Sequence, residues 1–211
     1  MAKKEAPINH LQQYLPPATF EAVVQYLHHF KVHLTVARER KSILGDYRHR
    51  TPHSNHRISV NGNLNAYSFL ITLLHELAHL LTFEQFGNRV TAHGQEWKKI
   101  YADLLDQFLK NKMFPADIEK ELLLSLRNPA ATSCAEDDLL RVLRKYDKKG
   151  HGSPMVEELP AQSLFRTSDG RVFRKGKKLR KRYQCMEVAT GRLYLFSPVY
   201  EVEMVAGGTS A

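Results

Sequence analysis

The sequence predicts an α+β fold: a mainly helical domain with a small sheet, followed by a small all-β module. Three observations support this. Residues 68–83 are apolar on nearly every side, which is typical of a helix buried at the centre of a domain. Runs that alternate apolar and polar residues within 32–60 predict short strands ahead of that helix. Short runs within 164–205, separated by expected turns at 168–170, 175–176 and 190–191, predict β structure alone.

The remaining elements of the first domain follow from apolar stripes and from the residues that end them. A short helix over 8–15 ends at Pro16, and an amphipathic helix over 19–30 follows. Strands are expected around 32–37, 43–47 and 58–60. The buried helix ends near Gly87, a natural C-cap. Further helices are expected over 95–110, 118–126 and near 137–146.

These elements divide the chain of 211 residues into three parts. Residues 1–128 form the main domain, and residues 161–211 form a basic β module. Residues 129–160 mix charge with several glycines and prolines, so they are expected to be a linker with one short helix. A chain with 43% hydrophobic residues, two cysteines and no secretory signal is expected to be cytoplasmic, with no membrane partner.

The buried helix carries one polar stripe, whose centre is a His-Glu-x-x-His motif. His75 and His79 are four residues apart, so both can face one metal ion, with Glu76 beside it. A catalytic zinc site keeps three protein ligands and one water. We therefore expect His75 and His79 to bind Zn²⁺, and Glu76 to act as general base on a zinc-activated water. The alternative is two buried histidines hydrogen-bonded to core partners, because each buried polar group needs a partner.

The third ligand is expected just after the buried helix. His93 lies on the connection to the next helix, from which it can fold back over the motif. Glu96 competes with it, but an acidic residue in the first turn of a helix is also explained by the helix dipole. Histidine is the more common zinc ligand, so His93 is preferred. Thr82 and Gln85 exclude the longer metzincin pattern, which has glycine and histidine there.

Four segments together make the chain resemble the SprT-like family, which includes bacterial SprT proteins and the eukaryotic Spartan proteases. These segments are 40–47, 58–61, 73–79 and 92–97. The resemblance covers about residues 15–125 and implies a zincin-like metalloprotease domain. It implies His75, His79 and His93 as the zinc ligands and Glu76 as the general base. It also implies protein substrates that are bound or crosslinked to DNA.

The C-terminal module departs from that family, many of whose members end in a zinc ribbon. Cys134 and Cys185 cannot build a four-thiolate site, so a ribbon-like module without metal is expected. Part of it has eight basic residues and no acid, which indicates a surface for nucleic-acid phosphates. Phe173 and Tyr183 are candidates for stacking on bases. The basic residues are Arg171, Arg174, Lys175, Lys177, Lys178, Arg180, Lys181 and Arg182.

The sequence thus predicts a zinc-dependent endopeptidase that DNA tethers to its protein substrates. One alternative is a nucleic-acid-binding or transcription-associated protein with a structural or vestigial zinc site. Another is a zinc hydrolase acting on something other than peptides, for instance RNA. The basic stretch has its own alternatives: a solvated hairpin, or a site for ribosomal RNA or for an acidic protein. Tyr47 is a candidate oxyanion donor. His49, His53 and His56 are expected on a solvent-exposed loop.

Overall fold

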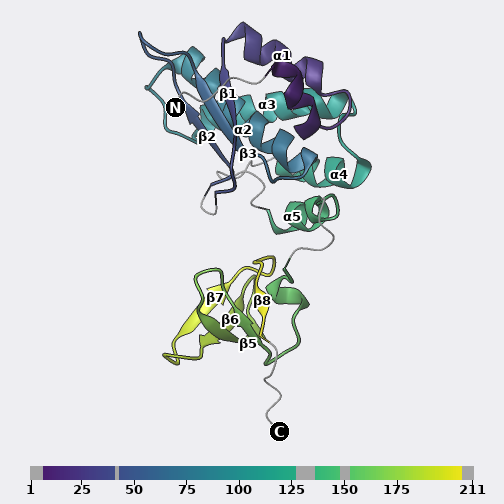
Figure 1. The fold of residues 1–211 in the computed structure, drawn as a ribbon, viewed down its shortest axis with the longest axis vertical. Coiled ribbons are helices and arrows are strands. Elements are labelled where there is room, and N and C mark those ends of the chain that lie inside the picture. The colour runs from purple at the N-terminus through teal and green to yellow at the C-terminus, as the bar shows by residue number, and fades with distance from the viewer. Residues whose placement is uncertain (1–6, 41–42, 127–135, 148–152, 206–211) are drawn as a thin grey trace. The chain divides into compact units, whose positions relative to one another are not determined.

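The computed structural model describes residues 7–40, 43–126, 136–147 and 153–205 (Figure 1). The chain forms two compact units, Met1–Tyr146 and Asp147–Ala211. The first mixes helices with a small sheet, and the second is built around an antiparallel sheet, so the predicted α+β class is confirmed.

The sheet of the first unit contains β1 (His33–Ala37), β2 (Gly45–Arg48) and β3 (Arg57–Asn61). β3 is the middle strand, parallel to β1 and antiparallel to β2. Its Ile58 and Val60 are buried in the core, against which α2 also packs. This order leaves β2 at one edge of the sheet, next to α2.

The expected central helix is α2 (Ala66–Phe86), which packs along β2, β3 and α3 (Gln95–Lys110). Asn65 begins α2, because its side chain accepts a hydrogen bond of 2.9 Å from the backbone N–H of Ser68. By length and composition alone α2 is able to cross a membrane, but 72% of its most apolar window is buried inside the unit. Its apolar surface is therefore covered by protein, as expected for a core helix.

The other helices of this unit cover the same core: a 3₁₀ helix η1 (Ile8–Tyr14), α1 (Phe20–His29), α4 (Ala116–Ser125) and α5 (Asp137–Arg144). The division between the units lies between Tyr146 and Asp147, whereas the sequence suggested a linker over 129–160. The reason is that Leu139 and Leu143 of α5 are buried in the first core. α5 is therefore part of the first unit.

The second unit contains the short helix η2 (Val156–Glu158) and the strands β4 (Leu164–Arg166), β5 (Val172–Lys178), β6 (Tyr183–Glu187), β7 (Leu193–Phe196) and β8 (Glu203–Met204). The strands form an antiparallel sheet in the order β7-β6-β5-β4-β8. The core of this unit contains Phe165, Phe173 and the buried Cys185, while Cys134 lies outside the described residues.

One predicted turn in this unit is wrong. Lys175-Gly176 suggested a break between strands, but β5 continues through both residues to Lys178, with an irregular register between Lys175 and Lys178. A Cβ on Gly176 would lie 2.2 Å from the carbonyl oxygen of Gln184. Gly176 therefore allows a close approach of two strands and does not mark a turn.

Candidate metal centre

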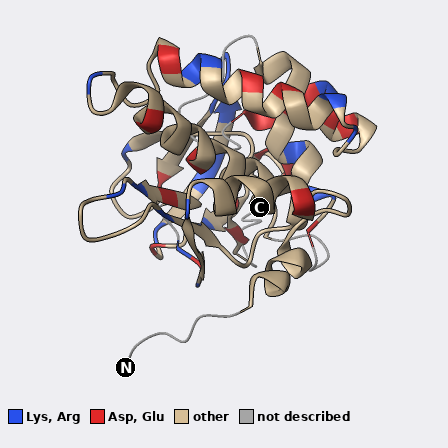
Figure 2. Ribbon diagram, turned by 90° about the horizontal axis from the view of Figure 1, so that it is seen from above, with Lys and Arg blue, Asp and Glu red and all other residues tan. Residues whose placement is uncertain are grey.

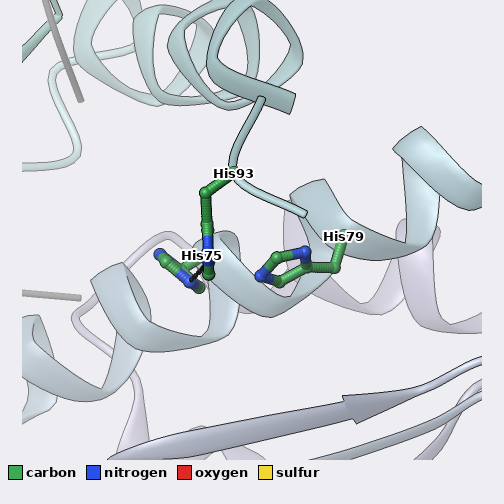
Figure 3. Close-up of side chains that lie close together, drawn as sticks. All are labelled: His75, His79 and His93. Carbon is green, nitrogen blue, oxygen red and sulfur yellow. Dashed lines mark hydrogen bonds between the residues drawn. The ribbon is translucent and has the colours of Figure 1, made fainter. Parts of the chain in front are cut away.

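Three histidines converge at the surface of α2. His75 and His79 project from α2, and His93 reaches them from the loop ahead of α3 (Figure 3). One ring nitrogen of each lies within 4.8 Å of the others, and the Nε2 atoms of His75 and His93 are 3.2 Å apart. Tetrahedral zinc with Zn–N distances of about 2.0–2.1 Å holds its nitrogens roughly 3.3 Å apart. The group therefore has the spacing of ligands to one ion.

The protonation state of the three rings also suits a metal. Burial lowers the pKa of His75 to about 3 and that of His79 to about 4, and each also faces a neighbouring histidine. Burial lowers the pKa of His93 as well. All three rings are therefore neutral at pH 7, the form that binds metals. Two neutral rings whose Nε2 atoms face each other at 3.2 Å need a shared proton or cation between them.

His93 reaches the site through an unusual backbone conformation. Its φ angle is 59°, in the left-handed region that residues with side chains rarely adopt. The N–H of Gly94 donates a 2.9 Å hydrogen bond to the carbonyl of Thr91, which closes the turn before α3 begins. Glu96 occupies the first turn of α3 and does not join the histidine group. The geometry thus brings His93 to the site and leaves Glu96 outside it.

Trp97, the only tryptophan of the chain, packs against all three histidines. Its ring centroid lies 4.7 Å from that of His75, 5.2 Å from that of His79 and 4.7 Å from that of His93. Nδ1 of His75 is buried without a hydrogen-bond partner, so packing against Trp97 holds this ring in place. Trp97 is therefore also a natural fluorescent reporter of the site.

Glu76 is buried beside the histidines, with 6% of the residue exposed. Burial and, to a lesser extent, the charge of Asp46 raise the pKa of its carboxyl to about 8, against the opposing charge of Arg40. Without a metal ion at the histidines, the carboxyl is therefore mostly protonated at pH 7. A divalent cation at the histidines would favour the ionised form, which a general base requires.

The site lies in an open cavity of about 710 Å³. One wall is the edge strand β2, through Gly45, Asp46 and Tyr47. The other described lining residues come from α2, from the loop after it, from α3 and from the segments on either side of β2. They are Ile43, Leu44, His49, His75, Glu76, His79, Thr82, Phe83, Gly87, Asn88, Val90, Thr91, Ala92, His93 and Trp97.

A family model described as the SprT-like family matches residues 10–119, about half of the chain. The chain belongs to the SprT-like family. Among curated proteins and solved structures, none matches it. The SprT-like segment contains β1–β3, α2 and α3, and with them all three histidines and Glu76. The second unit lies outside this segment.

Next to the three histidines lies a chain of polar contacts, centred on a buried histidine, that the sequence did not predict. His56 was expected on an exposed loop, but only 2% of it is exposed. Its Nδ1 is 2.9 Å from the hydroxyl of Tyr47, and its Nε2 is 3.2 Å from Oε1 of Glu84. The signal was the alternation of His56, Ile58 and Val60, which places all three on one buried face. His49 is exposed, stacks on Phe83 and lines the cavity.

Outside the SprT-like segment, two of the eight predicted phosphate-binding residues have hydrogen-bond or ion-pair partners of their own. Lys175 is 5% exposed, and its ammonium group donates to the carbonyls of Glu157 (3.1 Å) and Leu159 (2.6 Å). Arg171 pairs with Asp169, with Nε 2.7 Å from Oδ2. The other six are exposed: Arg174, Lys177, Lys178, Arg180, Lys181 and Arg182.

The aromatic residues expected to stack on bases are not available either. Phe173 is fully buried in the core of the second unit. Tyr183 is partly buried and is covered by Lys175, whose Nζ is 4.4 Å from the ring centroid. Burial therefore removes Phe173 as a stacking residue, and a lysine lies over the ring of Tyr183.

Proposed function

We propose that this protein is a zinc-dependent endopeptidase with a zincin-like catalytic unit. The observation that carries the proposal is the group formed by His75, His79 and His93, with the buried Glu76 at the same open cavity. These histidines would hold the metal. A bound zinc ion would polarise the scissile carbonyl and lower the pKa of a coordinated water.

Glu76 is the proton carrier in this proposal. It follows His75 directly in α2 and lines the cavity, although only 6% of the residue is exposed. Its ionised carboxylate would accept a proton from the attacking water and deliver it to the leaving amine. Glu76→Gln keeps the shape of the side chain and removes this ability, so it separates metal binding from turnover.

The edge strand β2 favours a peptide as substrate. Among the described residues, β3 is the one strand that pairs with β2, and residues of β2 line the cavity. An extended peptide can add to such an edge through backbone hydrogen bonds. By contrast, no lysine or arginine lines the cavity among the described residues, so cations to hold the phosphates of RNA are missing. This supports peptide over RNA hydrolysis.

A structural or vestigial metal site is the main alternative. Structural zinc sites are closed by four protein ligands, whereas catalytic sites keep one position open. Within the described part of the chain, the histidine group has three members and borders the cavity. This number of ligands supports the catalytic proposal.

We further propose that the second unit holds the protein on DNA, and that the substrates are proteins bound or crosslinked to DNA. Support comes from the six exposed cations of the β5–β6 hairpin, for which the sequence offers no acid within 171–182. In the first unit, basic and acidic residues are instead mixed along the helices (Figure 2). Tethering raises the local concentration of substrate, so weak sequence selectivity suffices. The proposed location is the cytoplasm, in contact with the nucleoid.

The test is cleavage of a DNA-bound protein by the zinc-loaded full chain, with and without free competitor DNA. Glu76→Gln should keep zinc and lose cleavage. Glu119→Gln, a matched change in α4 that removes an exposed ion pair with Lys112, should cleave normally. Fragments that competitor DNA suppresses support both proposals. Zinc and DNA binding without fragments would favour the alternative of a binding protein.

A further inference from the structure

A chain of four polar side chains leads from the protein surface to the cavity. Arg50 donates to both carboxylate oxygens of Glu84, at 3.0 Å and 3.3 Å. Glu84 contacts Nε2 of the buried His56 at 3.2 Å, and His56 contacts the hydroxyl of Tyr47 at 2.9 Å. Tyr47 lines the cavity, and its ring lies parallel to that of His79, with centroids 6.3 Å apart. The chain thus ends beside a candidate metal ligand.

The hydrogen bonds along this series of side chains determine which of its atoms carry a hydrogen. Both carboxylate oxygens of Glu84 accept hydrogen bonds from Arg50, so Glu84 is an acceptor toward His56 as well. Nε2 of His56 must then carry the proton that points at Glu84. Burial lowers the pKa of His56, and a neutral ring has one N–H, so Nδ1 is the acceptor and the Tyr47 hydroxyl donates to it. The oxygen of Tyr47 is left with its lone pairs, which makes it an acceptor for other groups.

This arrangement does not suit an oxyanion donor. Such a donor must give a hydrogen bond to the oxyanion, whereas the hydroxyl of Tyr47 already donates its hydrogen to His56. We propose that Tyr47 binds a backbone N–H of the substrate peptide, and that His56 and Glu84 are positioning residues that hold its hydroxyl as an acceptor. The inference rests on the proposed function. It is specific to peptides, since each peptide unit of a chain lying along β2 offers an N–H.

The test pairs a change in the protein with a change in the peptide. The zinc-loaded full chain in the Glu76→Gln form, which should bind without cleaving, is titrated with a fluorescent peptide that spans a cleavage site mapped with the wild type. A set of peptides is then made in which one backbone N–H at a time is N-methylated. We expect one position at which methylation weakens binding about five- to tenfold, the range of one hydrogen bond.

At that position, Tyr47→Phe should remove the effect of methylation while weakening binding of the unmodified peptide by a similar factor. The ring and its packing on His79 remain, so zinc binding, read from Trp97 fluorescence, should be unchanged. Glu84→Gln, which weakens the hold on His56, should lose part of the same coupling. Tyr26→Phe is the matched control, because Tyr26 donates to Gln107 away from the cavity.

The outcomes separate the two proposals. Suppose that the wild type cleaves the peptide, and that N-methylation weakens binding equally with and without the Tyr47→Phe change. That result would overturn the role proposed for Tyr47 and leave the proposed function standing. A phosphinic peptide mimics the tetrahedral intermediate. If Tyr47→Phe weakened binding of this peptide, and no N-methylation changed the effect of Tyr47→Phe, Tyr47 would be a hydrogen-bond donor to the oxyanion. If no form of the protein bound or cleaved the peptide, the proposed function itself would be overturned.

Discussion

The backbone of Gly45 lies so close to Glu76 that a Cβ at residue 45 would be 2.5 Å from Oε1 of the glutamate. The same Cβ would be 2.8 Å from Cγ2 of Thr72. Real Cβ atoms do not approach other heavy atoms this closely, so any side chain at this position must displace the carboxylate. The missing side chain of one residue in the edge strand therefore sets the place of the candidate general base.

Gly45→Ala should reduce kcat for peptide cleavage about a hundredfold, since misplacing a reacting group by about 1 Å has effects of that size. Zinc affinity, followed by Trp97 fluorescence, should not change. Gly62→Ala is the matched control, because its Cβ would meet Cγ1 of Val36 at 2.7 Å, away from the cavity. Full activity of Gly45→Ala would show that the position of Glu76 is not set by this contact.

His93→Gly should remove zinc without unfolding the protein. Glycine accepts the φ of 59° at residue 93 without strain, so the free energy of unfolding of the metal-free form should change by less than about 1 kcal/mol. Zinc affinity should fall at least about a hundredfold, because loss of supporting groups alone costs ten- to hundredfold. Glu96→Ala should keep its zinc in the same titration. Zinc loss in Glu96→Ala, with zinc kept in His93→Gly, would reverse the ligand assignment.

Removal of the metal should make stability depend on pH in both directions. The pKa values of His75 and His79, about 3 and 4, lie below the ordinary 6.5, so their contribution is complete above pH 6.5 and is lost as the pH falls toward those values. The pKa of Glu76, about 8, lies above 4.5, so its contribution is lost as the pH rises from 4.5 to 8. The metal-free protein should therefore be most stable near pH 6.5.

Thermal unfolding with a chelator, from pH 4 to 9, measures this dependence. Glu76→Gln should flatten the loss of Tm between pH 6.5 and 8, steepen the rise of Tm between pH 4.5 and 6.5, and leave the slope below pH 4.5 unchanged. Saturating zinc should raise Tm most near neutral pH, where the ligands are free of protons. An alkaline loss of equal size in Glu76→Gln would mean that another group causes it.

The centre of the site could be predicted from the sequence because its signals are local. Two histidines four residues apart on one helix must share a face, and a helix apolar on all other sides must be buried. The range expected for α3, 95–110, agrees with its observed bounds Gln95–Lys110. His93 was a reasonable expectation for the same reason, since a short loop limits how far it lies from α2.

What the sequence did not indicate depends on contacts between distant segments. His56 has two partners, Tyr47 from β2 and Glu84 from α2. The three residues belong to different segments, so no spacing within one element relates them. Lys175 belongs to a run of basic residues for which the sequence predicted a single surface. In the structure it is buried on the opposite side of β5 from the exposed Arg174. A regular strand alternates its side chains between two faces, so a run of charges along it does not place every member on the same surface.

Lys175→Met should therefore destabilise the second unit without weakening DNA binding. Its ammonium group serves two backbone carbonyls and the ring of Tyr183, so the change leaves those carbonyls without this donor, at about 1–3 kcal/mol. Hydrogen exchange of the full chain should show faster opening of residues 156–205, with the slope of log affinity against log salt unchanged. Lys177→Met is the matched control: an exposed side chain whose loss should leave exchange unchanged and reduce that slope by about 0.7–0.9. A reduced slope in Lys175→Met, with exchange unchanged, would place Lys175 in the DNA interface and refute the structural role given to it.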